Sequence, residues 1–351
     1  MVIKVLTGNY AVAEAVKLSN VDLITAYPIT PQTTIVERLS EFVDNGVIKA
    51  RLIRVESEFS ALAAAYGAAS CGARVFTATS SHGLLFMHEM LWWISGSRIP
   101  MVLAVVTRAL GPPWNIWNEH TDFMDQRDCG WLMVLAENNQ EILDTVIQLY
   151  RITEDERVYL PGILGLDGFL LSHASEPVDV PDGEVVKEFL KTRSQPYNMC
   201  LDEVLTMGNL PIAEDAIVMR YDMHQSMEAA KKGTMKDVCD ELRDQGYKVG
   251  LLKIRFFRPF PDEDLIEAIS GVKGALVFDR STSLGSLGHI HTEVLARAHT
   301  LSNKVVVKGV VAGLAGVDVG PNEIKKVLLK FINDVEEDGR VDSISEWVLG
   351  R

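Results

Sequence analysis

The stretch Ala26-Tyr27-Pro28-Ile29-Thr30-Pro31-Gln32-Thr33 decides how this chain folds. The residues before it, Val21 to Thr25, form a short, mostly apolar run with a β-branched bias, which predicts a buried strand. Thr33 to Val43 carry apolar side chains at helical spacing. The two prolines fix φ and hold their preceding residues out of the helical region. We therefore expect a stiff turn that holds the Thr30 hydroxyl at the carboxyl edge of a sheet, where open α/β sheets bind ligands. An ordinary strand-to-helix turn is the alternative.

Strands and helices alternate along the following residues. We expect strands at 51–56, 75–79, 101–106, 132–136 and 158–166, and helices at 8–19, 32–44, 57–70, 84–95 and 139–153. This alternation predicts a parallel, doubly wound α/β domain.

A boundary-like composition at 176–183 ends the first domain. We expect domains at 1–183 and 233–351, joined by a linker at 184–232. The second, smaller α/β domain is predicted to contain strands at 247–254, 274–278 and 305–311 and helices at 262–270 and 322–335.

The charge and cysteine content exclude several classes of protein. The 351 residues include 34 basic and 48 acidic side chains, a net charge of −14 that disfavours a nucleic-acid or anionic-membrane surface. No apolar run reaches the length of a membrane span and no signal-peptide pattern is present, so we expect a cytoplasmic protein. Four scattered cysteines disfavour a disulfide framework, and they disfavour a metal or iron–sulfur site built by this chain alone: Cys71, Cys129, Cys200 and Cys239.

Two charged residues follow predicted strands. Glu58 stands at the start of a helix rich in small residues, where the helix dipole alone favours a carboxylate. The alternative is a buried carboxylate that makes one short hydrogen bond to a cofactor nitrogen. Arg108 opens the loop after the strand at 101–106, and it either clamps a substrate carboxylate bidentately or forms a salt bridge within the loop.

Other polar and aromatic residues give weaker signals. The loop at 111–120 carries two tryptophans, as substrate-facing loops and subunit interfaces both do. His82 and His88 lie near an apolar helix and are interpreted as structural. His289 and His291 are weak evidence for a metal, and the glycines at 283–288 are weak evidence for an anion site. No metal ligands are assigned to this chain.

Several motifs occur together over nearly the whole chain. They are Tyr27-Pro-Ile-Thr-Pro31, Val55-Glu-Ser-Glu58, Phe76-Thr-Ala-Thr79 with Gly83 and Met87-His-Glu89, Thr107-Arg108, Asn115-Ile-Trp-Asn118, Gln126-Arg-Asp128 with Gly130-Trp131, Ala136-Glu-Asn-Asn-Gln-Glu141, and Arg258-Pro-Phe-Pro261. With this set the sequence resembles the alpha chain of the 2-oxoacid:ferredoxin oxidoreductases, most closely the pyruvate members. The combination of Y-P-I-T-P with E-S-E at this separation is specific.

The resemblance implies one subunit of a larger enzyme. The expected fold is two doubly wound domains: an N-terminal thiamine-diphosphate-binding-type domain and a smaller transketolase C-terminal-like domain. Thiamine diphosphate would be shared with a beta chain, and Mg²⁺ and [4Fe-4S] clusters would be held by the beta and gamma or delta chains. CoA would be the co-substrate, ferredoxin the electron acceptor, and the assembly a dimer of hetero-oligomers. No activity is expected of this chain alone.

The resemblance also assigns roles to three residues. Glu58 corresponds to the glutamate that hydrogen-bonds the aminopyrimidine of the cofactor, favouring the imino tautomer whose imine takes the C2 proton. Thr30 corresponds to a substrate-side threonine, and Arg108 to the arginine that meets the substrate carboxylate.

The sequence departs from the pattern of the pyruvate members in the substrate region. His82 stands where those members carry Gln, and Pro112-Pro113-Trp114 makes the substrate loop bulkier. Pyruvate is the first choice of substrate, and a larger branched or aryl 2-oxoacid is the alternative.

A further departure lies between Lys232 and Gly233. The residues on either side resemble two successive helices of the family, while the segment between those helices, including the first strand of the second domain, has no counterpart. A true deletion would leave a buried neighbouring strand with unpaired backbone groups, which favours omission of a segment from the sequence.

Two other functions compete with this one. A non-redox thiamine enzyme, such as a decarboxylase or a transketolase-like subunit, would release CO₂ without ferredoxin. A scaffold subunit with a decayed site is disfavoured by the intact Thr30, Glu58 and Arg108.

Overall fold

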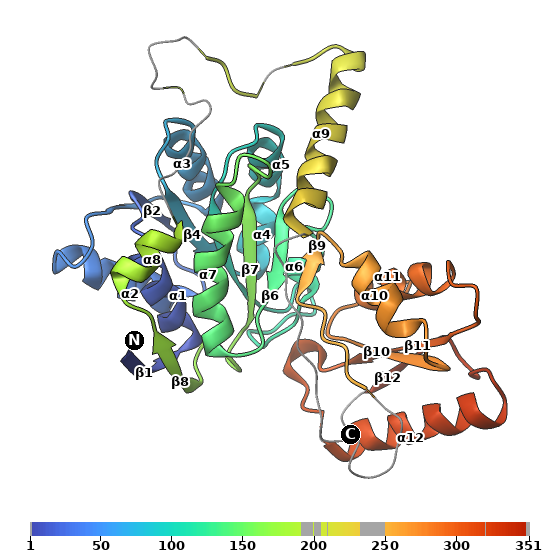
Figure 1. Cartoon of the computed structure of the whole chain (residues 1–351). Coiled ribbons are helices and arrows are strands. Elements are labelled where there is room, and N and C mark those ends of the chain that lie inside the picture. Colours follow the sequence, from blue (N-terminus) through green and yellow to red (C-terminus); the bar gives the residue numbers. More distant parts are fainter. Residues whose placement is uncertain are drawn as a thin grey trace. The chain divides into compact units, whose positions relative to one another are not determined.

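The computed structural model describes residues 2–190, 199, 205–208, 210–231, 250–319 and 321–348 (Figure 1). The chain forms two compact units, which we describe separately. The first comprises Met1–Ala229 and Leu314–Gly316, and the second comprises Ala230–Gly313 and Val317–Arg351. The gap expected between Lys232 and Gly233 lies outside the described residues.

Six parallel strands form the sheet of the first unit, in the order β3-β2-β4-β5-β7-β6. Their bounds are β2 (Leu23–Ala26), β3 (Arg51–Arg54), β4 (Val75–Thr79), β5 (Val102–Thr107), β6 (Leu132–Leu135) and β7 (Gly162–Asp167). Every residue of β4 and β5 is buried, as is typical of parallel strands covered on both faces. The predicted doubly wound α/β architecture is confirmed.

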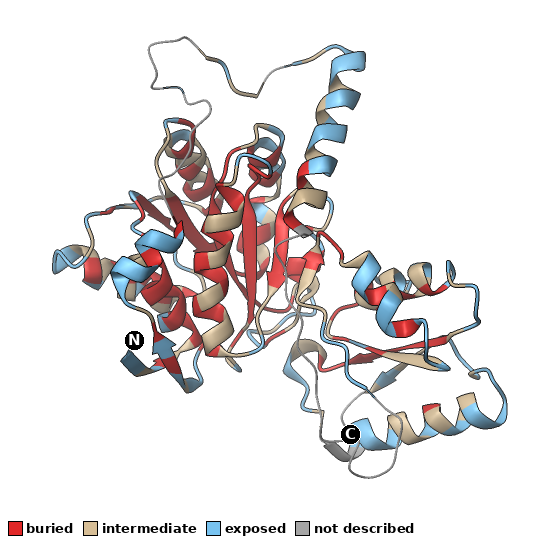
Figure 2. Ribbon diagram, viewed as in Figure 1, coloured by how far each residue is buried: buried red, intermediate tan, exposed pale blue. Residues whose placement is uncertain are grey.

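Helices cover both faces of this sheet (Figure 1). One group contains α1 (Gly8–Leu18), α2 (Thr33–Asp44), α7 (Asn139–Thr153) and α8 (Gly183–Leu190). The other contains α3 (Glu58–Ser70), α4 (Ser81–Phe86), α5 (His88–Gly96) and α6 (Thr121–Met124). The buried residues concentrate on the strands and on the helix faces turned toward them (Figure 2).

Helix α3 lies against β2 and β4 because its buried face is made of small side chains. Ala61 and Ala65 on that face are fully buried. The Ser57 hydroxyl caps the helix by accepting the backbone N–H of Ser60 at 3.2 Å. The cap fixes the position at which α3 starts, and therefore the position of Glu58.

The first unit also contains elements that the sequence did not predict. β1 (Val2–Thr7) pairs antiparallel with β8 (Ser175–Val180), although residues 176–183 read as a boundary. The helix predicted at 84–95 is two helices that meet at Met87, and the first of them begins at Ser81, three residues earlier than predicted. The expected linker contains α8 and α9 (Ala213–Lys231). The domain limits themselves stay a prediction.

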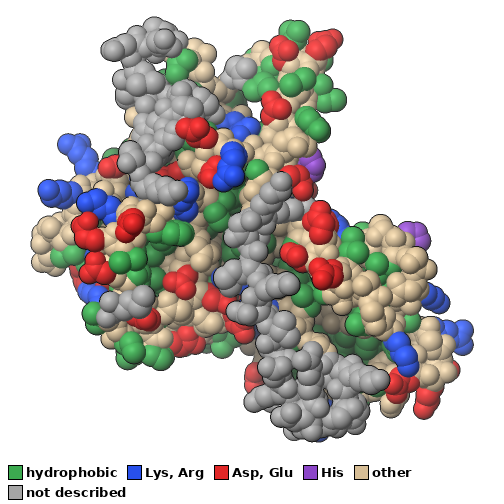
Figure 3. Space-filling model, viewed as in Figure 1, with side chains coloured by type: hydrophobic (Ala, Val, Ile, Leu, Met, Phe, Trp, Pro, Cys, Tyr) green, Lys and Arg blue, Asp and Glu red, His purple; other side chains and the backbone are tan. Residues whose placement is uncertain are grey.

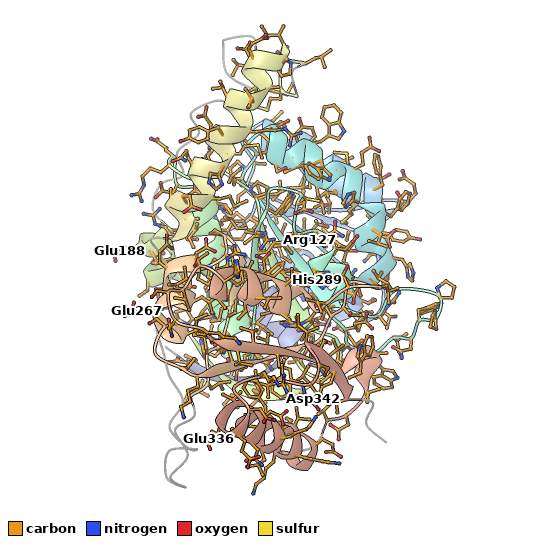
Figure 4. The ribbon with its side chains drawn as sticks, turned by 90° about the vertical axis from the view of Figure 1, so that its right-hand side faces the viewer. Arg127, Glu188, Glu267, His289, Glu336 and Asp342 are labelled. Carbon is orange, nitrogen blue, oxygen red and sulfur yellow. The ribbon has the colours of Figure 1, made fainter. Side chains whose placement is uncertain are left out.

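The second unit has a parallel sheet in the order β10-β11-β12. The strands of this sheet are β10 (Gly274–Asp279), β11 (Val306–Ala312) and β12 (Ser345–Val348). The unit also contains β9 (Phe256–Arg258), which is not part of this sheet, and the helices α10 (Asp262–Ile269), α11 (His289–Ala298) and α12 (Pro321–Glu337). Asp342, labelled in Figure 4, accepts a 2.9 Å bond from Lys330 of α12. The sequence analysis did not predict β9, α11 or β12.

One predicted strand of this unit is wrong where the structure describes it. Residues 250–254 are irregular, and 247–249 lie outside the described residues. A strand is defined by a paired neighbour, so apolar β-branched composition alone did not determine the conformation here.

Charged side chains of both signs are spread over the face shown in Figure 3. No helix among the described residues is long and apolar enough to cross a membrane.

A buried ion pair at the amino ends of the strands provides a test of this core. Arg74 donates two 2.7 Å bonds to Glu154 and a third bond to the carbonyl of Ser19. We expect Arg74→Ala to destabilise the protein by about 3 kcal/mol, because it removes both hydrogen bonds and the opposite charge that Arg74 supplies to the buried Glu154 carboxylate. Arg157→Ala removes an exposed pair with Asp155 and should change stability little. Denaturant unfolding measures the free energy of unfolding of both variants. An equal loss of stability in Arg74→Ala and Arg157→Ala would contradict this account.

Candidate active site

The turn after β2 is fixed by side-chain amides. Gln32 donates through Nε2 to the carbonyl of Tyr27 at 2.9 Å, and Asn9 of α1 donates to the carbonyl of Pro31 at 2.8 Å. Thr30 lies between these anchors and is exposed. The expected position of Thr30 beyond the carboxyl end of β2 agrees with the structure.

Arg108 directly follows β5 and reaches the same turn. Its Nη1 donates to the carbonyl of Thr30 at 2.6 Å, and its guanidinium lies 5.2 Å from the centre of the Trp114 ring. Arg108 is only 6% exposed, and its Nε has no hydrogen-bond partner. In the part of the chain that the structure describes, no carboxylate lies within 4.0 Å of this guanidinium, so the predicted salt bridge within the loop is absent there.

The electrostatics of Arg108 match this geometry. Burial lowers the pKa of the guanidinium, while the negative charges of Asp122 and Glu58 raise it. A guanidinium stays charged in proteins, so Arg108 is a buried cation without an ion-pair partner among the described residues.

Glu58 is the first residue of α3 and is 8% exposed. Among the described residues its carboxylate makes no hydrogen bond and no ion pair. A Cβ atom added to Gly83 would lie 2.6 Å from Oε1 of Glu58 and 2.5 Å from the hydroxyl oxygen of Thr79. Glycine is therefore required where α4 passes the carboxylate. Glu58 sits at a helix N-terminus, as the dipole argument expects, and it is also buried without a partner.

Asp122 of α6 is a buried carboxylate that the sequence did not single out. Its Oδ2 accepts the backbone N–H groups of Ser81 at 2.8 Å and Arg108 at 3.0 Å, and its Oδ1 accepts that of Phe123 at 2.8 Å. Burial raises the pKa of this carboxyl to about 7, although these hydrogen bonds and the charge of His120 act in the opposite direction. No local pattern marks this residue, because its partners are distant in sequence.

The loop between β5 and α6 is held at both ends. His120 contacts Asp167 at 2.7 Å, and the Trp117 ring lies 5.0 Å from that of Phe169. His82 contacts the carbonyl of Gly111 at 3.0 Å through Nε2. The indole of Trp114 meets the His82 ring edge-on at 6.0 Å and is 55% exposed. The predicted substrate loop thus lies beside Arg108.

His88 has a structural role. It contacts Gln126 through Nδ1 at 2.6 Å and accepts from the indole N–H of Trp92 at 3.1 Å. Burial raises the pKa of the neighbouring Cys129 thiol to about 12, so this thiol is no nucleophile.

His289 and His291 belong to α11 of the second unit (Figure 4 labels His289). His289 contacts the hydroxyl of Ser281 at 2.9 Å. Asp279 accepts the backbone N–H groups of Ile290 and His291, so a carboxylate already occupies the start of the helix and disfavours an anion there. The described residues contain no group of three or more side chains that could hold a metal ion.

Comparison with known proteins identifies the family of this chain. Residues 14–237 match the family described as pyruvate flavodoxin/ferredoxin oxidoreductase, thiamine diphosphate-binding, and residues 226–324 match core domain II of pyruvate:ferredoxin oxidoreductase. The first unit therefore defines a thiamine-diphosphate-binding type of oxidoreductase domain.

Full-length relatives define the family more closely. The chain is 43% identical to pyruvate synthase subunit PorA of Methanocaldococcus jannaschii, with 99% of this chain and 97% of the relative covered. It is 39% identical to ketoisovalerate oxidoreductase subunit VorA of Pyrococcus furiosus, with 98% and 97% covered. This chain belongs to the family of 2-oxoacid:ferredoxin oxidoreductase alpha subunits.

A solved structure shares the fold. It is 2-oxoglutarate:ferredoxin oxidoreductase from Magnetococcus marinus with 2-oxoglutarate, coenzyme A and succinyl-CoA bound, with a TM-score of 0.77 and 17% identity over 94% of this chain. The chain spans 65% of that longer chain.

The relatives contain residues that this chain lacks. The alignment with the Methanocaldococcus protein extends over 390 residues, more than the 351 of this chain. The position expected for the missing segment, between Lys232 and Gly233, stays a prediction.

The contact between Gly83 and Glu58 yields a stability test. We expect Gly83→Ala to destabilise the protein by about 1–3 kcal/mol, because the new methyl group displaces the Glu58 carboxylate and the Thr79 hydroxyl. Gly67→Ala is the matched control in α3, where nothing lies within 4 Å of the added atom, and should stabilise by about 0.5–1 kcal/mol. Denaturant unfolding measures the stability of both variants. An unchanged free energy of unfolding in Gly83→Ala would show that the Glu58 and Thr79 side chains can move aside.

Asp122 yields a pH test. Its pKa is raised on folding, so the folded state binds more protons than the unfolded state between the ordinary pKa of 3.8 and about 7. The stability that this group contributes is full below pH 3.8 and is lost as the pH rises through about 7. The stability of the wild type relative to Asp122→Asn should therefore fall between pH 5 and pH 8. A difference in melting temperature that stays constant over this range would contradict the raised pKa.

Proposed function

We propose that this chain is the alpha subunit of a thiamine-diphosphate-dependent enzyme that oxidatively decarboxylates a 2-oxoacid. The C1–C2 bond of the oxo-acid breaks to release CO₂, and the acyl carbon forms a thioester with the sulfur of CoA. Two electrons and the thiol proton are released, and the electrons pass through iron–sulfur clusters of partner chains to ferredoxin.

One observation carries this proposal. Arg108 and Glu58 are a cation and an anion that are both at least nine-tenths buried, and neither has an ion-pair partner among the described residues. Leaving charged groups buried and unpaired is costly, so such groups indicate a site that a ligand completes. Arg108 suits a substrate carboxylate, and the adjacent Thr30 hydroxyl is exposed to the same ligand.

The residues present also fit the cofactor. A buried carboxylate with free acceptor atoms matches the ring nitrogen of an aminopyrimidine, so Glu58 would hold and return a proton at that nitrogen. Gly83 leaves room for the carboxylate, and Ser57 fixes the helix start that presents it. When bound, thiamine diphosphate supplies the carbanion stabilisation that decarboxylation requires.

We infer partner chains from the family of this chain and from its exposed apolar side chains. We assign Mg²⁺ and the [4Fe-4S] clusters to a beta chain and to gamma or delta chains, and the assembly to a dimer of hetero-oligomers. Apolar side chains gather on the exposed part of α9 (Figure 3), where Ile217, Val218 and Tyr221 are exposed, as are Trp114 and Trp117 of the substrate loop. Exposed apolar clusters of this kind are typical of protein interfaces.

Pyruvate is our first choice of substrate, and a larger branched or aryl 2-oxoacid is the second. The second choice rests on the aromatic surroundings of Arg108, where Trp114 lies over the guanidinium and His82 meets the indole edge-on. Relatives named for pyruvate and for ketoisovalerate are similar to this chain at 43% and 39% identity, so their names do not decide between the two.

Glu58→Gln tests the proposal in the complex purified with its natural partner chains. We expect CoA-dependent ferredoxin reduction by one of pyruvate, 2-oxobutyrate, 2-oxoisovalerate, 2-oxoglutarate or phenylglyoxylate to fall about 100-fold, because an amide cannot carry the proton. Glu56→Gln is the matched control, since Glu56 is an exposed carboxylate two residues away.

The outcomes separate the alternatives. Full activity of Glu58→Gln would show that the cofactor role of this residue is wrong. CO₂ release that needs no ferredoxin would favour a non-redox thiamine enzyme, and an assembled complex that turns over no oxo-acid would favour a scaffold.

A further inference from the structure

Asp122 connects two segments that border the candidate site. One oxygen, Oδ2, accepts the N–H of Ser81 at the start of α4 and the N–H of Arg108 after β5. The Ser81 hydroxyl in turn donates to the carbonyl of Ala109 at 2.6 Å. The start of α4, the end of β5 and the four-residue helix α6 are thus tied together at one buried carboxylate.

Both tied segments carry groups of the candidate site. The backbone of Arg108 is anchored at Asp122, while its side chain reaches the carbonyl of Thr30. The backbone of Ser81 takes a positive φ of 49°, a conformation that a non-glycine residue adopts only when its surroundings hold it there. The turn fixed in this way leads to Gly83, against which Glu58 packs.

The chemistry of the contact requires a carboxylate. Three N–H donors converge on two oxygens, and a carboxylate is an acceptor at both. An amide of the same shape has one oxygen, so its NH₂ group would face a donor. The negative charge of Asp122 also favours the Arg108 cation without contacting it, since no ion pair joins them.

We propose that Asp122 is a positioning residue that holds Arg108 and the Ser81–Gly83 turn in the arrangement that binds the carboxylate of the 2-oxoacid. This inference rests on the proposed function. Asp122 is fully buried, so we assign its effect to the backbone that it anchors and not to contact with substrate or cofactor.

The charge state of Asp122 links this role to pH. The charged groups around it are Arg108 after β5, His120 ahead of α6 and, through its field on Arg108, Glu58 of α3. The Asp122 carboxyl has a pKa of about 7, so it takes up a proton as the pH falls below neutral and loses acceptor capacity toward the three N–H groups. We therefore expect the KM for the oxo-acid to rise below pH 7.

Asp122→Asn in the whole complex tests the role. At pH 8 we expect the KM for the oxo-acid to rise about 10-fold, with the KM for CoA unchanged and kcat within about 3-fold of the wild type. Asp22→Asn is the matched control. Asp22 also accepts the backbone N–H of an arginine, Arg74, at 2.7 Å, but at the amino edge of the sheet. Asp22→Asn should leave the KM for the oxo-acid, the KM for CoA and kcat unchanged.

The outcomes distinguish the inference from the proposed function. An active wild type with a wild-type KM in Asp122→Asn would overturn the positioning role alone, as would an equal rise in both KM values or a loss confined to kcat. A wild type that turns over no oxo-acid would overturn the proposed function and this inference with it. If Asp122→Asn does not assemble, the wild-type pH profile decides: an oxo-acid KM that stays constant between pH 6 and pH 8.5 would overturn the role.

Discussion

Parallel pairing of the central strands is the constraint on which the candidate site depends. Phe76 of β4 pairs with Ile24 of β2 and with Val102 of β5, so the three strands run in one direction and end at one edge of the sheet. The Thr30 turn, the start of α4 and Arg108 follow directly from these ends. A slip of one residue would exchange the side chains that β5 packs against its two helical layers, so the packing contacts that fix the register also fix the site.

Buried charged side chains are paired at one edge of this sheet and unpaired at the other. At the amino edge Arg74 is satisfied by Glu154 and by a backbone carbonyl. At the carboxyl edge Arg108 and Glu58 are as deeply buried, but among the described residues neither has an ion-pair partner. The ion pair at the amino edge stabilises the fold. The unpaired charges at the carboxyl edge lower its stability. This asymmetry within one sheet is the physical argument for the ligand site that we propose at the carboxyl edge.

The sequence predicted what depends on local pattern. Alternating strands and helices place Thr30, Glu58 and Arg108 beyond the carboxyl ends of three strands of one parallel sheet, and the structure brings them together. The fold prediction missed β12 and α11, which are short elements made stable by their neighbours. Asp122 could not be read from the sequence, because its role is to accept N–H groups from backbone that is distant along the chain and carries no side-chain signature.

In the second unit, the exposure of apolar side chains is the physical sign by which a missing neighbouring strand would be recognised. Its central strand, β11, is buried along its whole length, as a parallel strand flanked on both sides should be. The described residues pair β10 with a neighbouring strand, β11, on one side. The side chain of Phe278 in β10 is 41% exposed. Leu251 and Leu252 ahead of α10 are exposed as well. The relatives align over more residues than this chain contains, and apolar side chains that lack cover are what the loss of an adjoining strand would leave behind.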